Sequence, residues 1–90
     1  MNHSKTIEKY TGSLKELSRD IVSLDYDALV ELFTTLKEDF GKDAINDKEL
    51  KHPQLAEFLN NISDDIKQTL ERNMQPMADL CRSYNERGIR

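Results

Sequence analysis

The sequence predicts an all-α protein, a small bundle of three to four helices. The first observation is a row of large apolar residues spaced alternately three and four positions apart, which places them within about 100° of arc on a helix. The row consists of Ile7, Tyr10, Leu14, Leu17, Ile21 and Leu24. The second observation is that 90 residues include three Gly, two Pro and no Trp, whereas Lys, Glu, Leu and Asp are frequent. Such a composition favours helices over sheets, and this length is typical of a single domain with a small core.

The first helix is expected over residues 5–23, after a disordered start at residues 1–4. Ile7 and Tyr10 continue the apolar row in phase with the residues that follow, and this continuity favours a long helix. Gly12 falls in its interior, where a glycine costs about 1 kcal/mol relative to alanine.

A shorter first helix is the alternative. Ser13 and Glu16 fit the capping-box pattern, in which the cap side chain accepts a backbone hydrogen bond and the glutamate reaches back to the cap. Residues 1–12 would then form a loose arm.

The second helix is expected over residues 26–40. Asp25 can cap its first turn, and Gly41 suits the left-handed residue that commonly ends a helix. The apolar residues of this segment cover about 160° of the circumference, so the helix should contact two neighbours. The short link at Leu24 and Asp25 predicts that the first two helices form an N-terminal antiparallel hairpin.

Residues 41–52 are polar and are expected to form a loop. Pro53 then suits the first position of a third helix over residues 53–75, because proline lacks the backbone N–H that this position leaves unpaired. Pro76 predicts a break or a strong kink, since inside a helix its ring clashes with the preceding turn.

The apolar stripe of the third helix keeps nearly the same phase beyond Pro76. Residues 53–87 therefore form either one long kinked helix or two helices, and the sequence leaves both open. Residues 88–90 are expected to be a tail.

Ten apolar residues are expected to form the core because they lie in these stripes. They are Leu14, Leu17, Ile21, Leu29, Phe33, Leu36, Leu59, Ile62, Ile66 and Leu70. Asn73 interrupts the last stripe, and a lone Asn in an apolar seam can fix the register or oligomeric state of packed helices. The alternative is a helix that is distorted before Pro76, with Asn73 facing solvent.

Four apolar residues on either side of Pro76 are the candidate partner interface. They are Met74, Met77, Leu80 and Tyr84. Flexible thioethers beside aliphatic and aromatic side chains suit an adaptable docking surface, although residues of this kind also fill cores.

No group of residues points to catalysis, a cofactor or a metal. Cys81 is the only cysteine, and His3 and His52 show neither zinc-type spacing to it nor a position from which to act as its base. The acidic stretch that includes Asp39 and Asp43 lacks the glycine and the final glutamate of a calcium loop. The chain is therefore not expected to be an enzyme, and no cofactor is expected.

The net charge of −4 and the pI near 5.1 make nucleic acid a disfavoured partner. The chain shows no stretch with the apolar length of a membrane span or a signal peptide, so no membrane association is expected. A lone cysteine suits a reducing compartment, and the expected location is the cytoplasm.

The expected function is that of a non-catalytic protein–protein interaction or regulatory module, with another protein or a second copy of the chain as partner. Amphipathic helices are abundant, and a partner would enlarge a core that is small in a single chain. The alternative is a small nucleic-acid-associated accessory protein that uses the arginine-rich C-terminal segment. That segment carries Arg72, Arg82, Arg87 and Arg90.

Overall fold

The computed structural model of the chain describes residues 4–86, with side chains up to residue 84. These residues form helices and connecting turns, with no strand among them, so the all-α prediction is confirmed. The elements are α1 (Leu14–Val22), α2 (Tyr26–Glu49), α3 (Pro53–Thr69), the π-helical turn η1 (Leu70–Met74) and α4 (Gln75–Glu86). The predicted tail at residues 88–90 and the first three residues of the predicted disordered start lie outside the described part of the chain.

Helix α1 is the short form of the first helix, and the prediction of a helix over residues 5–23 is wrong. The Ser13 Oγ accepts a hydrogen bond from the Glu16 backbone N–H at 3.1 Å, while the Ser13 N–H donates to Glu16 Oε1 at 3.3 Å. This capping box begins the helix at Leu14. Upstream, a Cβ added to Gly12 would lie 2.8 Å from Cε1 of the Tyr10 ring, so a side chain at this position would displace that ring.

Replacing Ser13 with alanine should therefore loosen α1 selectively. Loss of an N-cap side chain costs roughly 1 kcal/mol of helix stability. Amide hydrogen exchange in α1 should accelerate about fivefold, which corresponds to that energy, while exchange in α2 and α3 stays unchanged. Unaltered exchange in α1 would show that the cap does not determine the helix start. The variant Ser18→Ala, at an exposed position inside α1, is the matched control.

Helix α2 is longer than predicted, and the loop expected at residues 41–52 is wrong. Gly41 does not end the helix, because this position lies against α3: a Cβ there would be 3.7 Å from the Ser63 Oγ. The Ser63 hydroxyl donates a 2.9 Å hydrogen bond to the Lys37 carbonyl oxygen and ties the two helices together. Most of the polar residues that suggested a loop form the exposed face of the last turns of α2, while Ala44 and Asp47 are buried.

The chain reverses direction over residues 50–52. Lys51 has a φ of 64°, the left-handed conformation that often follows a helix. The His52 backbone N–H donates to the Asp47 carbonyl oxygen at 2.7 Å, and Pro53 then starts α3 as predicted. The predicted Asp25 cap of α2 is also confirmed, since its Oδ1 accepts from the Ala28 N–H at 2.8 Å.

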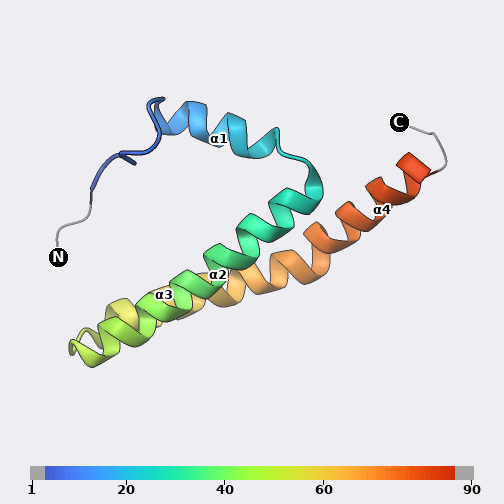
Figure 1. Cartoon of the computed structure of the whole chain (residues 1–90). Helices are drawn as coiled ribbons and strands as arrows, with labels where there is room; N and C mark the ends of the chain where they lie inside the picture. The colour runs from blue at the N-terminus through green and yellow to red at the C-terminus, as the bar shows by residue number, and fades with distance from the viewer. Residues whose placement is uncertain (1–3, 87–90) are drawn as a thin grey trace.

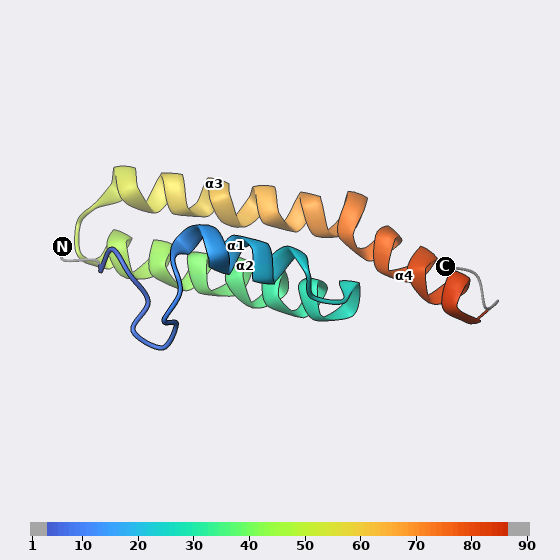
Figure 2. The same cartoon turned by 90° about the horizontal axis from the view of Figure 1, so that it is seen from above.

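The antiparallel pair in this structure is α2 with α3, not the first helix with the second. These two helices lie side by side and share the most extensive packing in the molecule (Figures 1 and 2). Helix α1 diverges from α2 in Figure 1, and Ile21 is its residue that packs against the core cluster. The reason is the length of α2, which gives α3 a full-length surface to pack on.

Residues 53–86 form a continuous helical rod, and its irregular turn lies before Pro76 and not at it. In η1 the Gln75 N–H bonds to the Leu70 carbonyl oxygen, five residues back, so the turn holds one residue more than an α-turn. Pro76 falls at the second position of α4. Asn73 is exposed and Met74 is buried, which confirms the interpretation of a helix that is distorted before the proline.

The core is a small cluster of Leu29, Leu70 and Met74, with Ile21, Val30, Phe33 and Ile66 packed around it. Three residues predicted for the core are exposed instead: Leu14 by 59%, Leu36 by 37% and Ile62 by 40%. Leu17 and Leu59 are half-buried. The three exposed residues are wrong predictions because their helices have no neighbour on that side.

The molecule is elongated, with extents of 53 × 30 × 14 Å and a radius of gyration of 16.3 Å. A globular chain of this length has a radius of gyration of about 12 Å. The accessible surface is 7675 Å², whereas a monomeric protein of 10.5 kDa typically exposes about 5,400 Å². The elongated chain therefore leaves more surface in contact with water than a compact fold of the same mass would.

Candidate interaction surface

The rod formed by α3, η1 and α4 carries large apolar side chains on its outside. Six of them, each between 37% and 65% exposed, are Leu55, Phe58, Ile62, Met77, Leu80 and Tyr84. We call these six residues the α3–α4 ridge. Three come from α3 and three from α4, so the ridge extends along nearly the whole rod.

The ridge lies on one side of the rod because five of its members each precede an inward-facing residue and Tyr84 follows Leu80 by four positions, which keeps it on the same side. Leu55 precedes the buried Ala56, and Met77 precedes the buried Ala78. One residue along a helix corresponds to a rotation of about 100°, so the members of the ridge are all turned the same way from the inward face. Leu80 precedes the half-buried Cys81 in the same manner.

The inward face of the rod, by contrast, contains small residues. Ala56 is 4% exposed and Ala78 is 2% exposed, and they face a neighbouring helix α2 whose Ala44 is 1% exposed. Small side chains let helix backbones approach closely but bury little apolar area. Around Ala56 and Ala78 the size order of an ordinary amphipathic helix, with its large side chains inside, is thus reversed, whereas the middle of the rod buries Leu70 and Met74.

The π-turn η1 places the α4 half of the ridge outside. With α-helical spacing throughout, the inward row of α3 would continue through Asn73, Met77 and Leu80. The extra residue in η1 advances the inward row by one position, to Met74, Ala78 and Cys81. Asn73, Met77 and Leu80 are therefore exposed.

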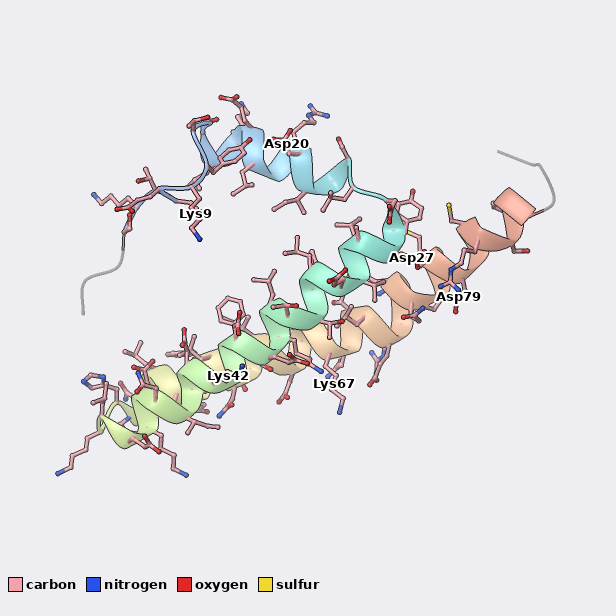
Figure 3. The ribbon with its side chains drawn as sticks, in the orientation of Figure 1. Lys9, Asp20, Asp27, Lys42, Lys67 and Asp79 are labelled. Atoms are coloured by element: carbon pink, nitrogen blue, oxygen red, sulfur yellow. The ribbon has the colours of Figure 1, made fainter. Side chains whose placement is uncertain are left out.

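The end of the rod also has little to pack on. In both Figure 1 and Figure 2, α4 extends past the start of α2. Where the two helices meet, the Arg82 Nη2 lies 3.2 Å from Asp27 Oδ1 and 2.8 Å from Asp79 Oδ1. Figure 3 shows these two aspartates next to each other, one from each helix. The pairs are half-exposed, and exposed ion pairs contribute about 0–1 kcal/mol each.

Of the four residues predicted as a partner interface, the structure places three on the ridge: Met77, Leu80 and Tyr84. The fourth, Met74, is 7% exposed and belongs to the core cluster, so its assignment to the interface is wrong. The sequence analysis assigned Leu55 and Phe58 to no site and Ile62 to the core. Their position one residue before the inward row could have revealed them, but only once that row was known.

The arginine-rich segment is only partly described. The Arg82 guanidinium is already bound by two carboxylates, while Arg87 and Arg90 lie outside the described residues. Arg72 is exposed on η1. The described residues therefore add no observation in favour of nucleic-acid binding.

Cys81 and His52 lie on different parts of the described structure. Cys81 lines an open depression of about 210 Å³ with Tyr26, Asp27 and Arg82, whereas His52 precedes the first residue of α3, at the turn between α2 and α3. His52 is close to Asp47, with 3.7 Å between Nδ1 and Oδ1. Within the described part of the chain, no three metal-ligating side chains come together, and none of its helices has the length and apolarity to cross a membrane.

One titratable side chain is clearly perturbed. The Tyr10 hydroxyl donates a 2.6 Å hydrogen bond to Asp20 Oδ2 and so joins the non-helical segment before Ser13 to α1. This hydrogen bond, together with desolvation and the negative charges of Asp20 and Glu16, raises the pKa of Tyr10 to about 12.

The contact of Tyr10 with Asp20 should therefore break at alkaline pH. Because the folded pKa lies above the usual value near 10, the contact is fully present below pH 10 and is lost as pH rises towards 12. A difference titration of phenolate absorbance between wild type and Tyr10→Phe isolates this group. The variant Asp20→Asn should bring the Tyr10 titration down towards pH 10, and a Tyr10 that titrates near 10 in the wild type would contradict the contact.

Comparisons of the chain with protein-family models, with curated protein sequences and with solved structures find no match. The function must therefore be argued from the surface that the fold presents. Its dominant feature is the α3–α4 ridge.

Proposed function

We propose that the protein is a non-catalytic helical interaction module that binds a partner protein through the α3–α4 ridge. The observation that supports this proposal is the reversed order of side-chain sizes at two places on the rod, around Ala56 in α3 and around Ala78 in α4. Small residues such as Ala56 and Ala78 face inward, while Phe58 and Leu80 are 65% and 52% exposed. Exposed apolar side chains that gather on one side of a small protein are typical of a protein–protein interface.

The free energy of burying apolar surface also favours a partner on the ridge. Burial of apolar surface yields roughly 25 cal/mol per Å², and the chain on its own buries only a small cluster of large side chains. A partner on the ridge would supply the missing burial, and binding would stabilise the fold by mass action. Three of the four charged residues of α3, Glu57, Asp64 and Lys67, follow inward residues and so lie on the flank opposite the ridge.

The proposal is tested by affinity capture from the native host with mass spectrometry, using three forms of the protein. The wild type should capture a partner that the double variant Met77→Glu and Leu80→Glu loses. The control Ile45→Glu should keep it, because Ile45 is also an exposed apolar residue, 62% exposed, but lies on α2 and not on the ridge. Because a second copy also counts as a partner, the molar mass of each form is measured by light scattering. A wild type that is monomeric, and that captures the same proteins as the double variant, would contradict the proposal.

A further inference from the structure

The outward row of the rod has a pseudo-palindromic sequence. The exposed residues that immediately precede Ala56, Leu59, Ser63, Ile66, Leu70, Met74, Ala78 and Cys81, followed by Tyr84 four positions after the last of them, are in order Leu55, Phe58, Ile62, Asp65, Thr69, Asn73, Met77, Leu80 and Tyr84. Three apolar residues come first, three polar residues follow, and three apolar residues end the row. Thr69 is the central member, and all nine residues are exposed.

The two arms of the row match in length as well as in polarity. Its members lie 4, 7, 11 and 14 residues before Thr69 and 4, 8, 11 and 15 residues after it. The arms differ by at most one residue, and the extra residue of η1 lies in the second arm. A surface that reads the same in both directions is what a two-fold symmetric interface between identical chains requires.

We propose that the partner of the ridge is a second copy of this chain, bound antiparallel with the two-fold axis at Thr69. This inference rests on the proposed function and names its partner. In this register Ile62 faces the partner's Met77, and Phe58 faces the partner's Leu80. Leu55 faces the partner's Tyr84 at each end.

The polar centre of the row is self-complementary in the same register. Asp65 faces the partner's Asn73, so a carboxylate that only accepts hydrogen bonds meets an amide that can donate them. Thr69 meets the partner's Thr69, and threonine hydroxyls both donate and accept. The two Asp65 side chains are separated by eight residues of helix, about 12 Å, which exceeds the Debye length of about 8 Å at physiological ionic strength.

The surface area agrees with this occupant. The accessible surface of 7675 Å² exceeds that of a typical monomer of this mass by roughly 2,200 Å². Stable homodimers bury roughly 2,000–5,000 Å² in total, or about 1,000–2,500 Å² from each subunit. A dimer that covered this excess of roughly 2,200 Å² on each copy would bury an area within this range. An occupant that is always present alongside the chain suits a fold whose own core is small.

The first measurement is molar mass by light scattering across protein concentrations. The wild type should have twice the chain mass of 10.5 kDa, with a melting temperature that rises with concentration. The variant Phe58→Asp should raise the dimer dissociation constant by at least about 30-fold, as expected for a buried anchor residue. Ile45→Asp is the matched control: 62% exposed against 65% for Phe58, but on α2, and it should leave the dissociation constant unchanged.

The second measurement tests the register by disulfide formation in a Cys81→Ala background. Thr69→Cys alone should give a covalent dimer, because both copies place this position on the axis. Ile62→Cys alone should not, since the two substituted positions are about 14 residues of helix apart, roughly 20 Å, whereas linked Cα atoms lie within about 7 Å. A mixture of Ile62→Cys and Met77→Cys chains should form the covalent heterodimer.

The outcomes separate this inference from the proposed function. A parallel dimer would link every single variant to itself, and a dimer that Phe58→Asp leaves intact would use another surface; either overturns the inference. A monomeric wild type that still loses a captured protein on substitution of Met77 and Leu80 would overturn the dimer but leave the interaction module standing. A monomer that captures nothing through the ridge would overturn both.

Discussion

A Pro76→Ala chain from which Asn73 is deleted should fold at least as stably as the Pro76→Ala chain itself. A Pro76→Ala chain from which Asn61 is deleted should not fold. The first deletion removes the extra residue of η1 and lets the rod become a regular α-helix. Met74, Ala78 and Cys81 then still face inward, because the deletion cancels the one-residue advance of the inward row.

Pro76 is replaced because the deletion of Asn73 would place it inside a regular helix, where a proline is costly. The same replacement accompanies the deletion of Asn61, so that the two chains can be compared. In η1, one carbonyl–amide pair is already shifted to a five-residue separation, and Pro76 donates no hydrogen bond. In an uninterrupted helix its ring would clash with the preceding turn, at a cost of about 3 kcal/mol or more. Pro76→Ala alone is therefore the reference for both deletions.

The deletion of Asn61 uses the same number of residues with the opposite consequence. It rotates everything from residue 62 by about 100°, so Asp64, Lys67 and Glu71 replace Ser63, Ile66 and Leu70 at the inward positions. Burial of unpaired charges in place of apolar residues costs several kcal/mol each. Such a loss is comparable with the whole stability of a domain of this size.

Far-UV circular dichroism and urea denaturation distinguish the two deletions. The chain without Asn73 should keep the helical signal and a cooperative transition at or above the urea midpoint of Pro76→Ala, whereas the chain without Asn61 should lose both. If the deletion of Asn73 is as damaging as the deletion of Asn61, the π-turn has a structural role that the shift of the inward row does not explain.

The fold class follows from local sequence signals, and so do the element starts that depend on side-chain caps. Asp25 and Pro53 begin α2 and α3 where the sequence predicts, because a cap acts through the first turn alone. The capping box of Ser13 is equally local, yet the apolar row through Ile7 favoured the longer helix. The row was in phase, but Ile7 at its start is 49% exposed, and periodicity without a covering neighbour does not form a helix.

The failures depend on tertiary structure. Gly41 ends a helix in isolation, but here its position lies against α3 and the helix continues through it. The polar residues that follow it form the solvent face of a helix, a pattern that composition alone cannot distinguish from a loop. Leu36 and Ile62 lie in apolar stripes, but whether a stripe is covered depends on a neighbour that the chain itself does not supply on that side.

The ridge was only partly predictable, because part of it depends on local chemistry and part on tertiary structure. Met77, Leu80 and Tyr84 were recognised by their chemistry, since large flexible and aromatic side chains after a proline suit a docking surface. Met74 was misplaced because only the extra residue of η1 moves it inward and Asn73 outward. No residue type encodes that turn; it follows from the competition between two possible inward rows.

Leu70→Ala should lower the free energy of unfolding by about 2–4 kcal/mol, the usual cost of removing a buried leucine side chain. Leu70 is 8% exposed and is one of three residues that make up the core cluster, so few neighbours can move to fill the space. Leu50→Ala is the matched control, because Leu50 is 55% exposed at the end of α2. It should change the free energy by no more than about 0.5 kcal/mol.

The dependence of these effects on protein concentration separates the core within one chain from the surface between chains. The loss from Leu70→Ala acts on the folded chain itself and should persist in urea denaturation at every concentration. The ridge variant Phe58→Ala should cost little where the protein is dilute and more as concentration rises, because the population of dimer contributes stability by mass action. Equal losses from Phe58→Ala at all concentrations would mean that Phe58 stabilises the single chain, contrary to its 65% exposure. A loss from Leu70→Ala that vanishes on dilution would place the core cluster at the dimer interface instead of inside each subunit.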